Sequence, residues 1–238
     1  MSSRAGRLTH AIASRLHRPL YNLLFRDSLF IVPLRERLCR QELFYNAFKA
    51  LESNGITGDY AEFGCYGGMT FALAYHEAKR HGHKAKLWAF DSFQGLPAPK
   101  LPQDDHPMWI EGSMEMSLER FHRLCREGGI PRGAYEVVPG YFEDSLPRMA
   151  VGDAPTNICL AFIDCDLYSS TMSVLTYLEP RLKHGMLLAF DDYFTWSDTQ
   201  TSGQRRACLE SFPAEGDWQL VPYMRFGWHG KSFVVEHA

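Results

Sequence analysis

Four aspartates near the middle of the chain are the residues best suited to chemistry. Asp164 and Asp166 follow an apolar run that begins at Ile158, and Asp191 and Asp192 follow a second apolar run. Each run has the composition of a buried strand, so both acidic pairs would reach one edge of a sheet. Carboxylates crowded there repel one another and raise each other's pKa values, and a bound divalent cation would keep them ionised. The pattern indicates a metal-assisted enzyme.

A glycine-rich turn lies before the acidic pairs in the sequence. Gly64, Gly67 and Gly68 separate an apolar run from a helical segment, so the backbone can turn tightly and leave room for a ligand at the helix N-terminus. Asp91 closes the next apolar run, where nucleotide-binding sheets place an acid that accepts hydrogen bonds from ribose hydroxyls. A tight turn without a ligand, and an acid that caps a loop, are the structural alternatives.

The glycine spacing excludes two phosphate-binding motifs. The chain has no GxxxxGK followed by Ser or Thr, and Gly64-x-x-Gly67-Gly68 differs from the GxGxxG of nicotinamide sites. Both of those motifs cradle phosphates. A cofactor with an adenosine but no pyrophosphate fits better, which favours S-adenosylmethionine.

The elements around these motifs alternate between short apolar runs and helical segments. This predicts an α/β fold with a mostly parallel sheet covered on both faces, plus a C-terminal antiparallel hairpin. We expect residues 1–54 to form an N-terminal helical arm and residues 55–238 to form one domain. The proline-rich segment 92–115 is expected to be a functional lid or disordered. Strands are expected near 60–64, 86–90, 135–138, 158–164, 186–191, 218–223 and 232–236, and helices near 34–51, 69–80, 118–126, 170–182 and 204–212.

Composition limits the partners and the compartment. With 238 residues and a net charge of -3, the chain can form a large domain and has no general attraction to nucleic acid. Six single cysteines without a CxxC pair indicate a reducing compartment, expected to be the cytoplasm, and no zinc site. Five arginines and no acid occur before Asp27. This basic arm is a candidate for packing on the domain or on a second subunit of a homo-oligomer, for contact with an anionic membrane, or for a transit peptide.

Five motifs, in order along the chain, resemble those of the macrocin O-methyltransferase family. The resemblance covers roughly residues 55 to 235. Members of that family include enzymes that methylate sugar hydroxyls on macrolide and aminocoumarin antibiotics. The motifs are Glu62-Phe63-Gly64 with Gly67-Gly68, Phe90 to Pro97, Gly140 to Pro147, Asp164 to Thr171, and Asp191-Asp192-Tyr193.

The resemblance implies a Rossmann-like class I methyltransferase fold, S-adenosylmethionine as the methyl donor, and Mg²⁺ beside the acceptor hydroxyl. Carried over by motif, Asp164, Asp191 and Asp192 are the expected metal ligands, and Asp166 is the expected general base. Many relatives have Trp-Arg before the paired glycines, where this chain has Cys65 and Tyr66. This difference affects the expected contacts to the amino-acid end of the cofactor. The residues expected to bind the cofactor are Glu62, Gly64, Tyr66, Gly67, Gly68, Asp91, Ser92, Glu143, Asp144 and Asp164.

These residue types suit the methylation of an alcohol. A sugar hydroxyl is a poor nucleophile near neutral pH, but a hard cation lowers its pKa and a nearby carboxylate takes its proton. Asp164 and Asp166 point the same way from an extended segment, so one can hold the ion while the other accepts the proton. The expected acceptor is a small molecule or glycan with a sugar hydroxyl. A catechol-like or phenolic acceptor, and a non-catalytic protein that binds S-adenosylmethionine, are the alternatives.

Other candidate residues lie mainly in the long segment 92–115. His106 is an alternative base, and Trp109 is a candidate for stacking on a sugar ring or for the core. Glu143 is a candidate for contact with adenine or for capping the next helix, as is its neighbour Asp144. Most other histidines, including His229, are expected at the surface.

Overall fold

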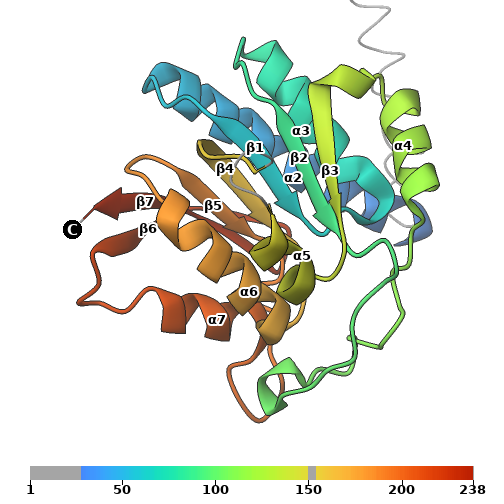
Figure 1. Ribbon diagram of the computed structural model, residues 1–238, viewed down its shortest axis with the longest axis vertical. Helices are drawn as coiled ribbons and strands as arrows, with labels where there is room; N and C mark the ends of the chain where they lie inside the picture. The colour runs from blue at the N-terminus through green and yellow to red at the C-terminus, as the bar shows by residue number, and fades with distance from the viewer. Residues whose placement is uncertain (1–27, 150–153, 238) are drawn as a thin grey trace, which may run out of the picture. The chain divides into compact units, whose positions relative to one another are not determined.

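The computed structural model describes residues 28–149 and 154–237, in which helices surround a single sheet (Figure 1). In these residues the sheet has seven strands in the order β3-β2-β1-β4-β5-β7-β6. Neighbours from β3 to β5 pair in parallel, and β7 pairs antiparallel with both β5 and β6. The strands are β1 Asp59–Phe63, β2 Leu87–Asp91, β3 Tyr135–Pro139, β4 Ile158–Ile163, β5 Leu187–Phe190, β6 Trp218–Phe226 and β7 Gly230–His237. The α-helices are α2 Ser28–Ser53, α3 Met69–Arg80, α4 Leu118–Glu127, α5 Phe142–Arg148, α6 Tyr168–Leu178 and α7 Gly203–Ser211.

This arrangement confirms the predicted α/β fold, a mostly parallel sheet with an antiparallel pair at its C-terminal end. The five parallel strands begin and end within one residue of their expected positions. The hairpin strands are longer than expected, so that only residues 227–229 separate them. Helix α5 was not among the expected ranges, because it has seven residues, with Pro147 inside it, and is too short to show a helical period.

Helix α2 begins earlier than the apolar pattern predicts, at Ser28, and contains Pro33. Residues 40–238 form one compact unit, which we call the sheet unit, and the part of α2 before residue 40 belongs to another. The domain boundary at residue 54 stays a prediction. The predicted membrane and subunit contacts of the basic arm fall on residues 1–27, outside the described residues. Within 28–149 and 154–237, no helix combines the length and apolar character needed to cross a membrane.

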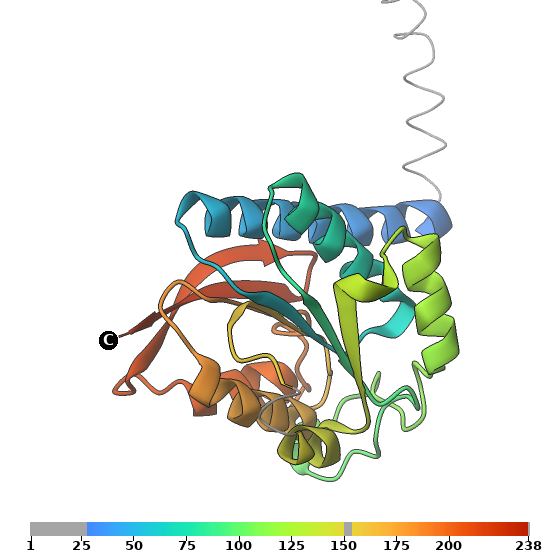
Figure 2. The ribbon, with the colours of Figure 1, turned by 45° about the horizontal axis from the view of Figure 1, so that its top comes forward.

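Helices cover both faces of the sheet within the sheet unit (Figure 2). The sheet-unit part of α2 lies with α3 and α4 on one face, and α5, α6 and α7 lie on the other. Strand β1 shows why both faces are apolar, since its successive side chains point to opposite sides. Tyr60 packs against Phe44 of α2 and Phe71 of α3, whereas Phe63 packs against Tyr177 of α6.

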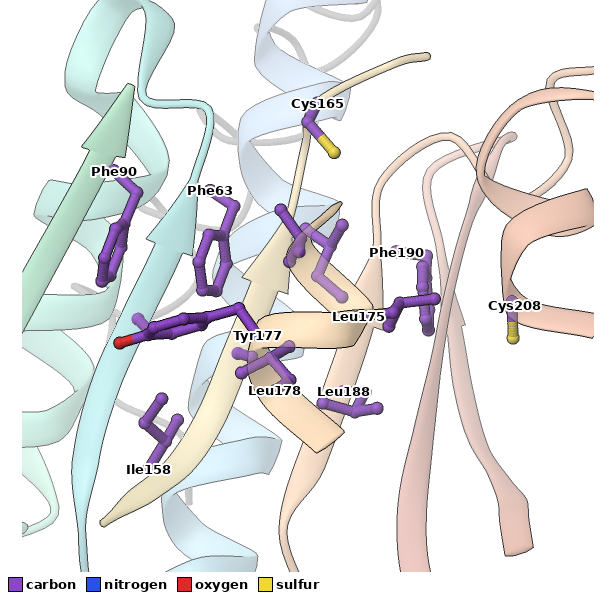
Figure 3. Close-up of a cluster of buried hydrophobic side chains, with 14 of the residues drawn as sticks. Phe63, Phe90, Ile158, Cys165, Leu175, Tyr177, Leu178, Leu188, Phe190 and Cys208 are labelled. Atoms are coloured by element: carbon purple, nitrogen blue, oxygen red, sulfur yellow. The ribbon is translucent and has the colours of Figure 1, made fainter. Parts of the chain in front are cut away.

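The core between the sheet and α6 fixes the strand ends (Figure 3). Phe63 and Phe90 stack on neighbouring strands with ring centroids 4.6 Å apart, and Tyr177 lies across both rings. Leu178 and Ile158 are fully buried in the same cluster. Because close-packed aromatic layers resist displacement, the residues that follow β1, β2 and β4 leave the sheet at fixed positions.

The strand order reverses direction between β1 and β4. From β1 the chain adds β2 and β3 on one side, and it then crosses back to add β4 and β5 on the other. In open parallel sheets such a reversal leaves a crevice beyond the carboxyl ends of the strands, and ligands bind in it. Strand β1 ends directly before Gly64, and β4 ends directly before Asp164. The two motifs predicted to bind ligands therefore meet at this switch point.

Candidate functional site

Gly64 brings the glycine turn into contact with the acidic segment. Its φ is +93°, and a Cβ placed on it would lie 1.8 Å from the carbonyl oxygen of Asp164. Any side chain at residue 64 would push apart the ends of β1 and β4. Gly68, with φ +61°, is the N-cap of α3. Gly67 has φ +76°, and a Cβ there would meet no atom within 4 Å, so the turn leaves open space beside the start of the helix.

Asp91 connects the glycine turn to the loop after β2. Its Oδ2 accepts a hydrogen bond from the backbone N–H of Cys65 at 2.7 Å, and its Oδ1 accepts one from the backbone N–H of Phe93 at 2.7 Å. Burial raises the pKa of Asp91, and the two backbone donors lower it. Since a carboxylate has about four lone-pair sites, Asp91 holds both loops and can still accept from a ligand.

Glu62 is fully buried on the α3 side of β1. Its carboxylate accepts hydrogen bonds from the Tyr60 hydroxyl and from the Thr70 hydroxyl, the latter at 2.7 Å. Burial raises the pKa of Glu62 to about 8. Its predicted contact with a cofactor stays a prediction.

Three aspartates face one another beyond the ends of β4 and β5. Asp164, Asp166 and Asp192 each place a carboxylate oxygen within 4.8 Å of the others. Burial, followed by the negative charges of neighbouring aspartates, raises the pKa values of Asp164 and Asp166 well above their ordinary values. Three carboxylates at this spacing can supply oxygen ligands to one divalent cation.

Asp166 has an unusual backbone conformation within this group. Its φ is +59°, in a region that residues other than glycine rarely occupy. Burial and Asp192 raise the pKa of its carboxylate, whereas Trp109 lowers it, and a Cβ on Gly203 would come within 2.4 Å of the Trp109 indole ring. Trp109 is buried with Leu96 and Leu167 in a small apolar cluster. Strain at such a position is commonly retained for function.

Asp191 points to different partners from the other three aspartates. Arg40 of α2 donates to it twice, from Nε to Oδ1 at 3.1 Å and from Nη2 to Oδ2 at 2.6 Å. Burial raises the pKa of Asp191 to about 6, against the lowering effect of the Arg40 charge. His229, expected at the surface, is buried instead, and its Nδ1 lies 3.8 Å from Oδ2 of Asp191 and 3.8 Å from Oδ1 of Asp192. Asp191, Asp192 and His229 thus form a second group of potential ligands.

The long loop between β2 and α4 is anchored beside the acidic residues. Asp104, fully buried, accepts a hydrogen bond from the backbone N–H of Ser169 at 2.9 Å, in the first turn of α6. Its other oxygen accepts from the backbone N–H groups of Lys100 and Leu101. Gln200 donates to a carbonyl in the same loop segment, at 2.7 Å. These contacts hold the loop segment around Asp104 to the start of α6 and to Gln200.

The remaining predicted cofactor residues are exposed or paired with other residues of the chain. Tyr66, in the glycine turn, is 56% exposed. Ser92 Oγ donates to the carbonyl of Gly95 at 2.8 Å, within a turn of the loop. Glu143 pairs with Lys100 at 2.7 Å, and Asp144 pairs with Arg148 at 3.3 Å. The cofactor contacts of these four residues stay predictions.

Sequence reasoning did not find Arg40, His229 or Asp104. Arg40 lies 151 residues from Asp191, and Asp104 lies 65 residues from Ser169, so no local spacing relates the partners. The available signals were an arginine on an otherwise apolar helix face and an acid within a proline-rich loop. Neither signal is specific.

Comparison with known proteins places this site in a family context. The family model Macrocin-O-methyltransferase (TylF) matches residues 35–208. The chain is 32% identical over 151 residues to mycinamicin III 3''-O-methyltransferase of Micromonospora griseorubida, covering 59% of this chain and 57% of that protein. It is 29% identical over 179 residues to 8-demethyl-8-(2,3-dimethoxy-alpha-L-rhamnosyl)-tetracenomycin-C 4'-O-methyltransferase of Streptomyces olivaceus, covering 72% and 66%. The chain therefore spans about three fifths of the length of these curated relatives.

Solved structures share the fold at lower sequence identity. The O-methyltransferase NovP has a TM-score of 0.69 at 23% identity, over 84% of this chain and 80% of its own. The calicheamicin methyltransferase CalS11 has a TM-score of 0.66 at 20% identity, over 98% of this chain and 94% of its own. These similarities establish a common architecture.

Proposed function

Because the chain belongs to the macrocin O-methyltransferase family, we propose that it is an S-adenosylmethionine-dependent O-methyltransferase that acts on a hydroxyl of a sugar or glycoside. The observation that carries the proposal is the meeting of the glycine turn and the acidic residues at one switch point of the sheet. The two curated relatives are named as O-methyltransferases of mycinamicin III and of a rhamnosyl-bearing tetracenomycin C, which supports the acceptor class.

The glycine turn fits S-adenosylmethionine. Gly67 leaves open space beside the N-terminus of α3, and Asp91 lies at the end of the adjacent strand with acceptor capacity for ribose hydroxyls. When bound, the cofactor supplies an activated methyl group.

The acidic residues fit a divalent cation such as Mg²⁺. Their donor set consists of carboxylate oxygens, which Mg²⁺ prefers, and the pKa values of Asp164 and Asp166 are raised in part by mutual repulsion that a cation would relieve. We assign the cation to Asp164, Asp191 and Asp192. When bound, it would lower the pKa of an acceptor hydroxyl.

Asp166 is our candidate for the general base. Its carboxylate lies in the same group as Asp164 and Asp192, so a hydroxyl brought to that group is within its reach. When ionised, this carboxylate has lone pairs that can receive the proton of the hydroxyl. Positioned proton transfer of this kind contributes roughly 10²- to 10⁴-fold to a rate.

The proposal is tested by incubating the full chain with S-adenosylmethionine and a panel of glycosylated natural products, sugar nucleotides and phenolic diols. We expect methyl transfer to a sugar hydroxyl, loss of transfer with a chelator, and recovery with Mg²⁺. Transfer to phenolic diols alone would favour the phenolic alternative. Failure of calorimetry to detect any binding of S-adenosylmethionine would contradict the enzyme assignment.

A further inference from the structure

We propose that Arg40 is a built-in counterion of the acidic residues, and that it releases Asp191 when the site takes up a divalent cation. This inference rests on the proposed metal site and concerns a residue that no motif of the family resemblance includes. Arg40 is a positioning residue in this account, because it acts through Asp191.

The contact between Arg40 and Asp191 is two-pronged and shielded from water. Arg40 is 9% exposed and Asp191 is 4% exposed, and two separate nitrogen–oxygen pairs join the side chains at 3.1 and 2.6 Å. A guanidinium matches a carboxylate in this paired geometry, and such pairs are the strongest of the charge-assisted hydrogen bonds. Both oxygens of Asp191 are therefore engaged by the chain's own cation.

The surrounding charges explain why one carboxylate is paired with arginine and the others are grouped. Four aspartates meet at this edge, and burying them together without a positive charge would be very costly. The Arg40 guanidinium is the main electrostatic influence that lowers the pKa of Asp191, and it also lowers the pKa of Asp164. Asp164, Asp166 and Asp192 remain an excess of negative charge that a divalent cation can neutralise.

The same geometry makes Arg40 a competitor of the cation. Asp191 cannot offer a cation the lone pairs that it gives to Arg40, and a guanidinium beside the site repels a second positive charge. Arg40 therefore stabilises the metal-free protein and weakens metal binding. Removing it should have opposite effects on these two properties, whereas a residue that merely supported the fold would impair both.

The experiment compares Mg²⁺ affinity by calorimetry, and Tm in EDTA, for the wild type, Arg40→Gln and Arg40→Lys. We expect Arg40→Gln to lower Tm in EDTA by roughly 5–10 °C, because buried Asp191 and the half-buried aspartates beside it lose their counterion. We expect it to bind Mg²⁺ about tenfold more tightly, and Mg²⁺ to restore much of the lost Tm. Arg40→Lys keeps the positive charge but lacks the two-pronged guanidinium. Its Mg²⁺ affinity and its Tm in EDTA should therefore lie between those of the wild type and Arg40→Gln. Arg37→Gln, on an exposed residue of the same helix, is the matched control and should change neither property.

A variant of the partner residue keeps the inference falsifiable if Arg40→Gln folds poorly. In an Asp191→Asn background the pair is already broken, so adding Arg40→Lys should change the Tm in EDTA less than it does in the wild type. If the wild type binds Mg²⁺ and both Arg40 variants bind it equally or more weakly, the proposed role of Arg40 is wrong but the metal site is retained. Absence of Mg²⁺ binding by the wild type would overturn the proposed metal site as well.

Discussion

The carboxylates at the ends of β1 and β2 differ in their surroundings from those at the ends of β4 and β5. Glu62 and Asp91 each accept two hydrogen bonds from protein donors, either hydroxyls or backbone N–H groups. Asp164, Asp166 and Asp192 instead lie within 4.8 Å of one another. Both groups are largely buried, and burial raises pKa values in both.

In the proposed function, this difference separates carboxylates that hold the fold of the site from carboxylates that bind the cation and take the proton. On the β1 side, the acids hold the glycine turn and its helix in place, which suits an uncharged ribose and adenine. On the β4 side, repulsion remains among like charges, which suits a cation and a proton transfer. Gly64 is the point at which the two sides touch, through the carbonyl of Asp164.

The largest expected effect is on turnover at Asp166. Replacing it by Asn keeps the size of the side chain but removes the proton acceptor, so we expect kcat to fall roughly 10²- to 10⁴-fold. Affinities for S-adenosylmethionine and Mg²⁺, measured by calorimetry, should change little. Near-normal turnover would remove Asp166 as the base, and loss of Mg²⁺ binding would make it a metal ligand.

A large loss of stability is expected where the two sides touch. Gly64→Ala combines a positive φ with a clash against Asp164, so we expect the free energy of unfolding to fall by about 3 kcal/mol or more. Gly67→Ala has a similar φ but open space around it and should cost about 1 kcal/mol. Denaturant unfolding of both variants checks this contrast, and equal losses would show that the close approach at Gly64 is unimportant.

A smaller effect is expected from the anchor of the long loop. Asp104→Asn leaves backbone N–H groups of Lys100, Leu101 or Ser169 without an acceptor, at a cost of about 1–3 kcal/mol. Hydrogen exchange in the loop should increase and the KM for the acceptor should rise, with cofactor affinity retained. The exposed neighbour Asp105→Asn is the control. If Asp104→Asn behaved like that control, the loop would not depend on this anchor.

A further expected effect is a pH dependence of stability that comes from Glu62. Its pKa is about 8 in the folded protein against an ordinary 4.5, so the folded state holds the extra proton between these values. This contribution is fully present below pH 4.5 and is lost as pH rises through about 8, by at most about 1.4 kcal/mol per pH unit. Glu62→Gln cannot titrate, so the stability difference between wild type and variant should change across that range. A constant difference would place the pKa of Glu62 near its ordinary value.

Much of the sheet and of the site could be predicted from local sequence. The apolar runs before Gly64, Asp91, Asp164 and Asp191 fix strands within one residue, because each strand is buried on both faces and ends at a polar or glycine position. The carboxyl ends of parallel strands meet at one edge, so the sequence also brought these motifs together correctly.

The remaining features depend on contacts between distant residues. Asp191 differs from the other three aspartates because it is paired with Arg40. That contact depends on how α2 packs on the sheet. The left-handed conformation of Asp166 could not be predicted from the sequence, because a positive φ is commonly expected only at glycine and asparagine. The hydrogen bond from the Ser169 N–H, in the first turn of α6, to Asp104 depends on how the long loop folds back. No periodic pattern in the sequence predicts that fold.

Calorimetric titration with Mg²⁺ of the wild type, Asp192→Asn and Glu62→Gln tests the contrast between the two sides most directly. The two variants each remove one buried or half-buried carboxylate, one from each side of the switch point. We predict that the wild type and Glu62→Gln bind Mg²⁺ with similar affinity and that Asp192→Asn loses binding. Equal Mg²⁺ binding by Asp192→Asn and the wild type would contradict the assignment of a cation to the ends of β4 and β5.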